Sequence, residues 1–197
     1  MWCIGCGTDG TGLCAPCLAA APPADSVLAG GVRVRAARSY AGVFAGAILA
    51  MKRGERAFLE PLAHAVAPLV EPGATLVPAV TLRVRAAERG FDQARELARR
   101  VAALRGAAVA DVLVKHGRPQ RGMGRAARLA ARARFTVRPG AEPAGPVLLI
   151  DDVVTTGATL RAAAGALVAA GYRVAGAVVV AAAPGETPGA ATESGGR

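Results

Sequence analysis

Aromatic residues and long apolar runs are both scarce in this chain of 197 residues. Aromatic side chains make up 4% of the sequence, although 53% of all residues are hydrophobic and many of these are alanine. This composition predicts an ordered core in which helices pack closely through small side chains. No apolar run approaches the roughly 18 to 20 residues of a membrane-spanning helix, and Met1 precedes a cysteine motif instead of a basic and then apolar leader. We therefore expect a cytoplasmic protein without membrane insertion.

Two catalytic patterns are also missing. No Gly-Lys dipeptide occurs, which argues against a phosphate-binding loop of the GxxxxGK[ST] type. The two histidines, His64 and His116, are isolated in the sequence, and no Ser/His/Asp or free-cysteine nucleophile arrangement is suggested. His64 is expected to be a surface or core residue of an amphipathic helix, whereas His116 borders a basic segment and could touch an anion. We assign neither histidine a catalytic role.

Lysine is nearly absent, because only Lys52 and Lys115 accompany the arginines, yet the formal net charge is +10. The positive charge is concentrated in two segments. Residues 83–105 carry seven Arg against three acidic residues, and residues 118–138 carry seven Arg and no acidic residue. Two basic segments in one fold indicate an anionic ligand, either a small polyphosphate or a nucleic acid, although two solvated helix faces would give the same pattern.

The order of periodic segments predicts an α/β fold. Strands that alternate with helices imply a mostly parallel sheet flanked by helices. We expect a small Cys-rich module and linker over residues 1–30, the α/β domain over residues 31–183, and a disordered tail over residues 184–197, which has nothing to bury. The expected strands are 32–34, 75–80, 109–114, 147–150 and 174–180, and the expected helices are 40–52, 58–70, 92–104 and 160–170.

All four cysteines lie in two Cys-x-x-Cys pairs, Cys3 with Cys6 and Cys14 with Cys17. Each pair can aim two thiolates at one ion, and two pairs supply the tetrahedral set that Zn²⁺ prefers. With all four positions filled by protein, the metal would have no open position for a substrate, so we expect a role in folding or partner contact. Two alternatives remain open: a pair of disulfides, which a cytosolic location disfavours, and an iron site with similar ligands.

Residues 147–159, VLLIDDVVTTGAT, combine a buried-type strand with two adjacent carboxylates and a turn of small residues. The strand delivers the following residues to the carboxyl edge of the sheet, where α/β proteins bind ligands. Asp151 and Asp152 are suited to accept hydrogen bonds from the two vicinal hydroxyls of a ribose. The turn opens the next helix, and its N–H groups and hydroxyls can surround a phosphate dianion. The residues of this turn are Thr155, Thr156, Gly157, Ala158 and Thr159.

A helix N-cap by Thr155 or Thr156 is expected in any case, but it does not explain the adjacent carboxylates. Residues 147–159 resemble the phosphoribosyl pyrophosphate (PRPP) signature of type I phosphoribosyltransferases, and they fit that pattern at every position. The remainder resembles one branch of that superfamily, the ComF family, which is associated with DNA uptake during bacterial competence. Together, the two resemblances cover most of residues 3–180. Outside the signature they rest on the two Cys-x-x-Cys pairs, Tyr40, Lys52, Gly54, Val77-Pro78, Arg89-Gly-Phe-Asp-Gln93, Gln120 and Arg128.

The resemblance implies a type I phosphoribosyltransferase α/β domain with an N-terminal zinc knuckle and a helical hood. It implies transfer of a phosphoribosyl group from PRPP with release of pyrophosphate. Mg²⁺ would accompany PRPP, Asp151 and Asp152 would hold the ribose in the catalytic centre, and residues 155–159 would hold the 5′-phosphate. The chain departs from the usual family pattern at Ala79-Val80, at Asp92, where Asn is common, and near Ala131, where another Asn is common.

Two anion-binding loops are also expected. The resemblance implies that the loop of residues 81–85, with Arg83, faces the pyrophosphate. In the second basic segment Arg121, Arg125, Arg128 and Arg132 follow the spacing of a single helical face. In related phosphoribosyltransferases the corresponding loop closes over pyrophosphate, where its cations stabilise the departing anion.

An alternative function is a non-catalytic accessory of DNA uptake that binds single-stranded DNA and partner proteins of the uptake machinery. No aromatic residue lies between Arg118 and Arg134 to stack on a base, so binding there would depend on the phosphate backbone and on salt. The acceptor substrate of a transfer reaction stays open, and so does the choice between a monomer and a homodimer.

Overall fold

The computed structural model describes residues 2–10, 12–24, 27–29, 31–117, 134–139 and 145–183. Its centre is a six-stranded sheet in the order β1-β2-β8-β7-β3-β4. Five neighbouring strands are parallel, and β1 is an antiparallel edge strand against β2. The strands of this sheet are β1 (Val27–Ala29), β2 (Val32–Ser39), β3 (Thr75–Pro78), β4 (Ala108–Val109), β7 (Val147–Val154) and β8 (Val174–Ala182).

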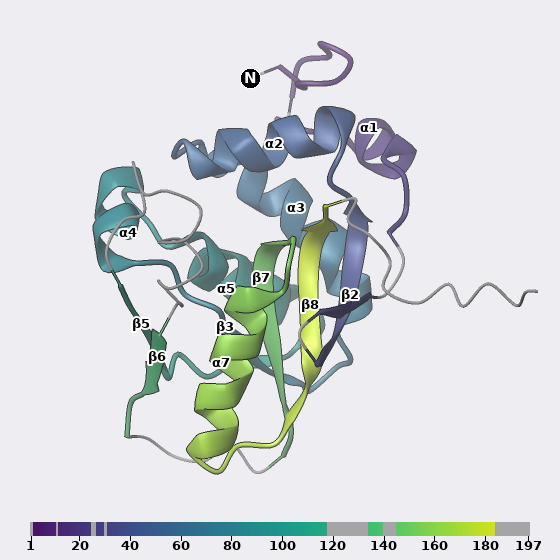
Figure 1. Ribbon diagram of the computed structural model, residues 1–197. Coiled ribbons are helices and arrows are strands. Elements are labelled where there is room, and N and C mark those ends of the chain that lie inside the picture. Colours follow the sequence, from purple (N-terminus) through teal and green to yellow (C-terminus); the bar gives the residue numbers. More distant parts are fainter. Residues whose placement is uncertain are drawn as a thin grey trace, which may run out of the picture.

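Helices cover both faces of the sheet, which confirms the predicted α/β class. The first face packs against α2 (Gly42–Lys52), α3 (Leu59–Val66) and α5 (Gln93–Arg105). The second face packs against α7 (Ala158–Ala169) and against a separate two-stranded antiparallel sheet of β5 (Leu113–His116) and β6 (Arg134–Val137). Figure 1 shows α7 in front of the main sheet and α3 and α5 behind it.

Strand β7 is the central element of both cores. Because side chains alternate along a strand, Leu149 lies in the core beneath α7, whereas Ile150 lies in the core beneath α2, α3 and α5. Both side chains are fully buried. A strand that is buried on both faces reads as a continuous apolar run, which explains why the sequence predicted the first half of β7, residues 147–150, but not its continuation through Asp151 to Val154. The parallel strands end along one edge of the sheet, the upper edge in Figure 1.

Two of the predicted segments are divided in the structure. The expected helix 58–70 consists of the 3-10 helix η1 (Arg56–Phe58), α3 and the 3-10 helix η2 (Ala67–Leu69). Pro68 lacks the N–H group that a continuing α-helix needs, so the helical pattern changes there. The expected strand 109–114 is shared between β4 in the main sheet and β5 in the two-stranded sheet.

The Cys-rich segment forms a short helix, α1 (Ala15–Ala20), and packs onto the α2 and α3 side of the fold. Leu13 and Cys3 are buried in the same core as Phe58. A methyl group on Gly12 would lie 2.9 Å from Cε1 of Phe58, so only glycine allows this close approach. Among the helices that the structure describes, none is long and apolar enough to cross a bilayer. The predicted tail, residues 184–197, lies outside the described residues.

Candidate functional site

A cavity of about 380 Å³ opens at the carboxyl edge of the main sheet. Its size falls in the range of about 300 to 1,000 Å³ that is usual for small-molecule sites. Four basic side chains and two carboxylates face it, so its described charged lining is positive overall and suits an anionic ligand. These charged residues are Lys52, Arg85, Arg89, Lys115, Asp151 and Asp152.

The two predicted carboxylates emerge near the end of β7 and receive their counter-ions from different elements. Lys52, the last residue of α2, places Nζ 3.1 Å from Oδ2 of Asp152. The charge of Lys115, in β5, acts most strongly on Asp151. Oδ1 of Asp151 also accepts a hydrogen bond from the backbone N–H of Asp152 at 2.8 Å. Two lysines from opposite layers of the fold thus line the cavity together with the carboxylate pair.

Burial raises the pKa of Asp151 to about 7, and the neighbouring charge of Asp152 adds to this rise. Lys115 and Lys52 act in the opposite direction but do not offset the loss of water around Asp151. Burial likewise lowers the pKa of Lys115, against the stabilising charges of Asp151 and Asp152. Shifted pKa values that result from burial and from neighbouring charges acting in opposite directions are typical of a functional site, where charged groups are kept away from water.

The turn of residues 155–159 lies beside the carboxylates, and Thr155 and Thr159 line the cavity. Gly157 adopts a left-handed conformation, with φ of 69°, immediately before the first turn of α7. No side chain caps α7 at this position, and the N–H of Ala158 makes only a long contact of 3.4 Å with Oγ1 of Thr156. An uncapped helix N-terminus is positively polarised and presents N–H donors, so it can bind a phosphate.

A second set of basic side chains comes from α4 (Arg83–Arg89), where the sequence led us to expect a loop. Arg85 and Arg89 line the cavity, whereas Arg83 is exposed and is not among the lining residues. Positions four apart share one face of a helix, so Arg85 and Arg89 point together while Arg83 lies on a different face. Recognising residues 83–89 as a helix would have identified this pair.

Asp92 connects α5 to the turn that follows β3. Its carboxylate caps α5 by accepting the backbone N–H of Arg95 at 3.1 Å, and its second oxygen accepts the N–H of Thr81 at 2.8 Å. Thr81 lines the cavity. Each bond uses a different carboxylate oxygen, so the side-chain amide of Asn could accept only one of them in this geometry. Asp92 thus fixes the wall of the cavity although it does not line it.

Gln93 lines the cavity as well and is 3% exposed. Its Oε1 accepts a hydrogen bond from Arg89 at 2.7 Å, which fixes the orientation of the amide because arginine can only donate. Its Nε2 is buried and has no hydrogen-bond partner among the described residues. Leaving such a donor unpaired costs about 1 to 3 kcal/mol and is more common at functional sites than elsewhere.

Several residues that line the cavity were not predicted as site residues from the sequence. Tyr40, Lys52, Arg89 and Gln93 belong to the pattern that carries the family resemblance, so a signal for them existed. Lys115 had no such signal, because only the pairing of β5 with β6 places it at the cavity.

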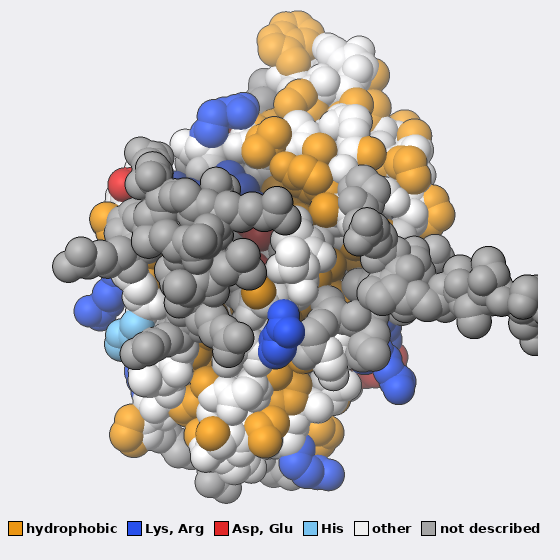
Figure 2. All heavy atoms as spheres, in the orientation of Figure 1, with side chains coloured by type: hydrophobic (Ala, Val, Ile, Leu, Met, Phe, Trp, Pro, Cys, Tyr) orange, Lys and Arg blue, Asp and Glu red, His pale blue; other side chains and the backbone are white. Residues whose placement is uncertain are grey.

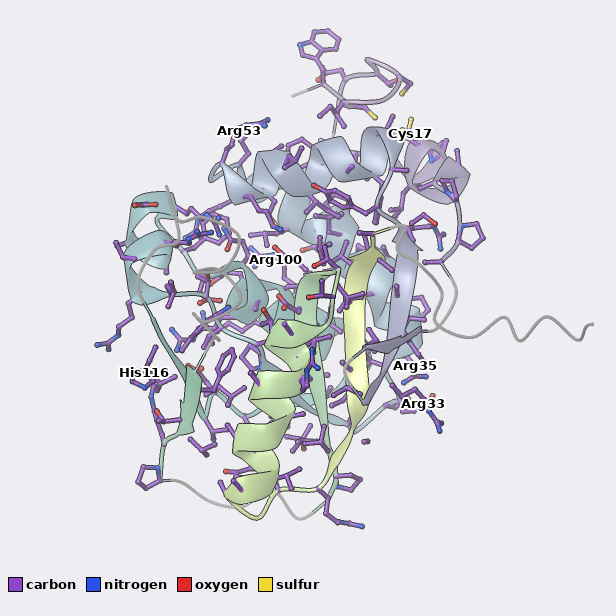
Figure 3. All side chains as sticks on the ribbon, viewed as in Figure 1. Cys17, Arg33, Arg35, Arg53, Arg100 and His116 are labelled. Carbon is purple, nitrogen blue, oxygen red and sulfur yellow. The ribbon has the colours of Figure 1, made fainter. Side chains whose placement is uncertain are left out.

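The predicted loop residues Arg121, Arg125 and Arg128 lie outside the described part of the chain. The strands on either side of them in the sequence are described, and Lys115 of β5 lines the cavity. His116, one residue further, is exposed, and its Nε2 lies 2.8 Å from Oγ1 of Thr136. Figure 3 shows His116 on the outer side of the two-stranded sheet, and it is not among the cavity-lining residues.

The four cysteines form a second candidate site at the opposite side of α2. Their sulfur atoms all lie within 4.8 Å of one another, and none of them forms a disulfide. The Cys3 and Cys14 sulfurs are 3.5 Å apart, and those of Cys6 and Cys14 are 3.6 Å apart. A set of sulfur ligands with this spacing could hold one metal ion.

Backbone hydrogen bonds and neighbouring thiols shift the pKa values of the cysteines in this cluster. Hydrogen bonds from the backbone, led by the N–H of Cys14, lower the pKa of Cys3 to about 6. Interactions with the other cysteines, above all Cys14, raise the pKa of Cys17 to about 12. Four thiolates at this spacing repel one another, and a divalent cation among them would offset that repulsion. A methyl group on Gly5 would lie 2.8 Å from Sγ of Cys17, so glycine is needed there for the sulfur to fit.

Large apolar side chains are exposed beside the cysteine cluster. Trp2 is 69% exposed and Ile4 is 44% exposed, and Leu49 of α2 is 46% exposed. Figure 2 shows hydrophobic side chains gathered over the upper part of the molecule, across the Cys-rich segment and α2. An exposed apolar surface of this kind is usual at contacts with other molecules.

Comparison of the sequence with models of known protein families gives no match, and none is found among curated proteins. Hydrogen-bond acceptors for a diol, an uncapped helix N-terminus and two arginines of α4 surround one space of about 380 Å³. This arrangement suits a sugar that carries phosphate groups at both ends.

Proposed function

We propose that the chain binds PRPP and is a phosphoribosyltransferase-like protein of the ComF family. One observation carries the proposal: Asp151 and Asp152 at the end of β7 share a cavity with Thr155 and Thr159, at the start of α7. Carboxylates beside an uncapped helix N-terminus provide acceptors for ribose hydroxyls and donors for a 5′-phosphate within one space. The type I phosphoribosyltransferase fold is proposed on the same ground.

The pyrophosphate of PRPP is proposed to lie beside α4. Arg85 and Arg89 face the cavity from that helix, and Lys115 faces it from β5. Fixed positive groups at this place would stabilise the negative charge that develops on pyrophosphate as it leaves the anomeric carbon. Because pyrophosphate is a good leaving group, orientation and charge stabilisation are the main contributions that the protein has to make to phosphoribosyl transfer.

Mg²⁺ fits the chemistry of this site, because Asp151 and Asp152 are hard oxygen donors beside the space for a polyphosphate. When bound with PRPP, the ion would neutralise part of the charge on the diphosphate. We further propose that the metal of the cysteine cluster is zinc in a structural role, because four protein ligands leave no open position for a substrate.

The direct test is titration of the protein with PRPP in the presence and absence of Mg²⁺. Binding in the micromolar range that needs Mg²⁺ would support the proposal and justify a screen for the acceptor by pyrophosphate release. Absence of binding at millimolar PRPP would contradict it and would indicate that the fold has another use.

A second candidate function is an accessory role in DNA uptake, through binding of single-stranded DNA and of partner proteins. One observation favours it: residues 118–138 carry seven Arg and no acidic residue, in a protein of formal charge +10. Backbone-driven binding falls steeply with salt, by about 10³ to 10⁵ between 50 and 200 mM salt for six to ten phosphate contacts. DNA affinity that survives replacement of Arg121, Arg125 and Arg128 by Ala would contradict the proposed surface.

A further inference from the structure

Lys52 forms an ion pair with Asp152 inside the cavity. Its Nζ lies 3.1 Å from Oδ2 of Asp152, and the two side chains are 30% and 14% exposed. An ammonium and a carboxylate at this distance form a charge-assisted hydrogen bond, which is stronger when water is partly excluded. Lys52 is therefore the counter-ion of this carboxylate.

The place of Lys52 in α2 keeps it there. Lys52 is the last residue of α2, and cations are stabilised at the carboxyl end of a helix. The next residue, Arg53, is directed away from the cavity, as Figure 3 shows, and pairs instead with Glu55 at 3.2 Å. Two adjacent cations at the same helix end thus have separate roles, one facing the carboxylates and the other facing solvent.

The charge of the cavity lining opposes the entry of a bare divalent cation. Four basic side chains and two carboxylates face the cavity, and Lys52 uses an oxygen that would coordinate the metal. A polyphosphate changes this balance, because it brings negative charge for the cation and offers oxygens to which the ammonium of Lys52 can turn. The cavity lining therefore favours binding of the metal together with the polyphosphate over binding of the metal alone.

We propose that Lys52 is a specificity-determining residue that excludes a free divalent cation from Asp152, so that the cation enters the site only together with the polyphosphate ligand. The assignment of the ligand rests on the proposed function, but the exclusion of the free cation follows from the Lys52–Asp152 pair alone. Lys52 then exchanges partners, from the carboxylate in the empty site to a phosphate oxygen in the occupied one.

The test uses Mn²⁺ alone as the probe, with binding followed by electron paramagnetic resonance. Removing a unit charge about 4 Å from a divalent cation strengthens its binding by about 10- to 100-fold even at a dielectric close to that of bulk water. We expect Lys52→Met to bind Mn²⁺ tighter than wild type by that factor. Lys52→Arg, which keeps the charge, and Arg53→Met, which changes the neighbouring exposed cation, should both stay at the weak wild-type affinity.

Further variants show where the Mn²⁺ ion binds and which results would overturn the proposal. Adding Asp152→Asn to Lys52→Met should abolish the gain, which locates the ion at Asp152 and not at the cysteines. Equal Mn²⁺ affinity in Lys52→Met and wild type would overturn the proposal. If Lys52→Met does not fold, wild type and Asp152→Asn decide: Mn²⁺ binding that is tight in wild type and lost in Asp152→Asn would overturn the exclusion, and equally weak binding in both would support it. Failure of wild type to bind PRPP would refute the proposed function and leave the measurement with Mn²⁺ alone valid.

Discussion

Asp92 accepts the backbone N–H of Thr81 at 2.8 Å and thereby ties the first turn of α5 to the loop after β3. The same carboxylate caps α5 through the N–H of Arg95. We expect Asp92→Ala to lower the free energy of unfolding by about 2 to 3 kcal/mol, since it removes a helix cap and leaves a second donor unpaired. Asp92→Asn should lower the free energy of unfolding by about 1 kcal/mol, because one amide oxygen replaces two carboxylate acceptors.

Urea unfolding measures both changes, and Glu88→Gln, on the exposed surface of α4, is the matched control. An unfolding free energy for Asp92→Ala equal to that of the control would show that the two hydrogen bonds contribute nothing to stability.

The raised pKa of Asp151 has a consequence for stability. Its pKa is about 7 in the folded protein against an ordinary value of 3.8, so between these pH values the folded state holds a proton that the unfolded state has lost. Stability from this group is therefore present at low pH and is lost as pH rises through about 7. Relative to Asp151→Asn, the unfolding free energy of wild type should fall by about 2 to 4 kcal/mol between pH 4 and pH 8.

Urea unfolding of the two proteins across this pH range checks the sign. A wild-type stability that rises relative to Asp151→Asn as the pH increases would mean that the carboxyl group is held ionised and not neutral.

Two glycines of the α7 region should respond to alanine in opposite ways. Gly157 has a φ of 69°, so Gly157→Ala forces a side chain into the left-handed region and should destabilise the protein by about 1 kcal/mol or more. Gly165 lies inside α7, and nothing lies within 4 Å of a methyl group added there. Gly165→Ala should therefore stabilise the protein by about 0.5 to 1 kcal/mol. Thermal unfolding distinguishes the two, and shifts of the same sign would contradict the conformation described for Gly157.

The cysteine cluster should contain one tightly bound metal ion per chain. Elemental analysis of the purified protein is expected to give zinc, whereas iron would be visible from its absorption. Cys17→Ser should lose most of the metal and lower the melting temperature, because binding of the metal and folding of this segment are coupled. Leu49→Ala, at a position of α2 that is 46% exposed and provides no sulfur ligand, is the control and should keep its metal. Full metal content in Cys17→Ser would contradict a four-cysteine site.

The elements that the sequence predicted well are those with a strong local pattern. Residues 147–150 formed a recognisable buried run, and they lie in β7 with Asp151 and Asp152 at its carboxyl end. Helix α5 was also expected almost within its observed bounds, because its apolar positions follow helical spacing.

The parts that were not predicted depend on contacts between distant segments. Lys115 reaches the cavity only because β5 pairs with β6, about twenty residues further along the chain, and not with the main sheet. The short helix α4 contains too few apolar residues to give a periodic signal, so Arg85 and Arg89 could not be separated from Arg83 by sequence. The interaction of Lys52 with Asp152 likewise joins α2 to β7, and no local pattern records it.

Calorimetric titration with PRPP and Mg²⁺ measures whether the cavity at the end of β7 binds PRPP through its carboxylate pair. Wild type should bind, and Asp151→Asn and Asp152→Asn should each weaken binding by roughly 10- to 100-fold, because an amide keeps one acceptor oxygen where the carboxyl group offers two to the ribose hydroxyls. Asp111→Asn, at a carboxylate that pairs with Arg95 outside the cavity, should bind as wild type does. Binding that is equal in all four proteins, or that is absent from wild type at millimolar PRPP, would contradict the proposed function.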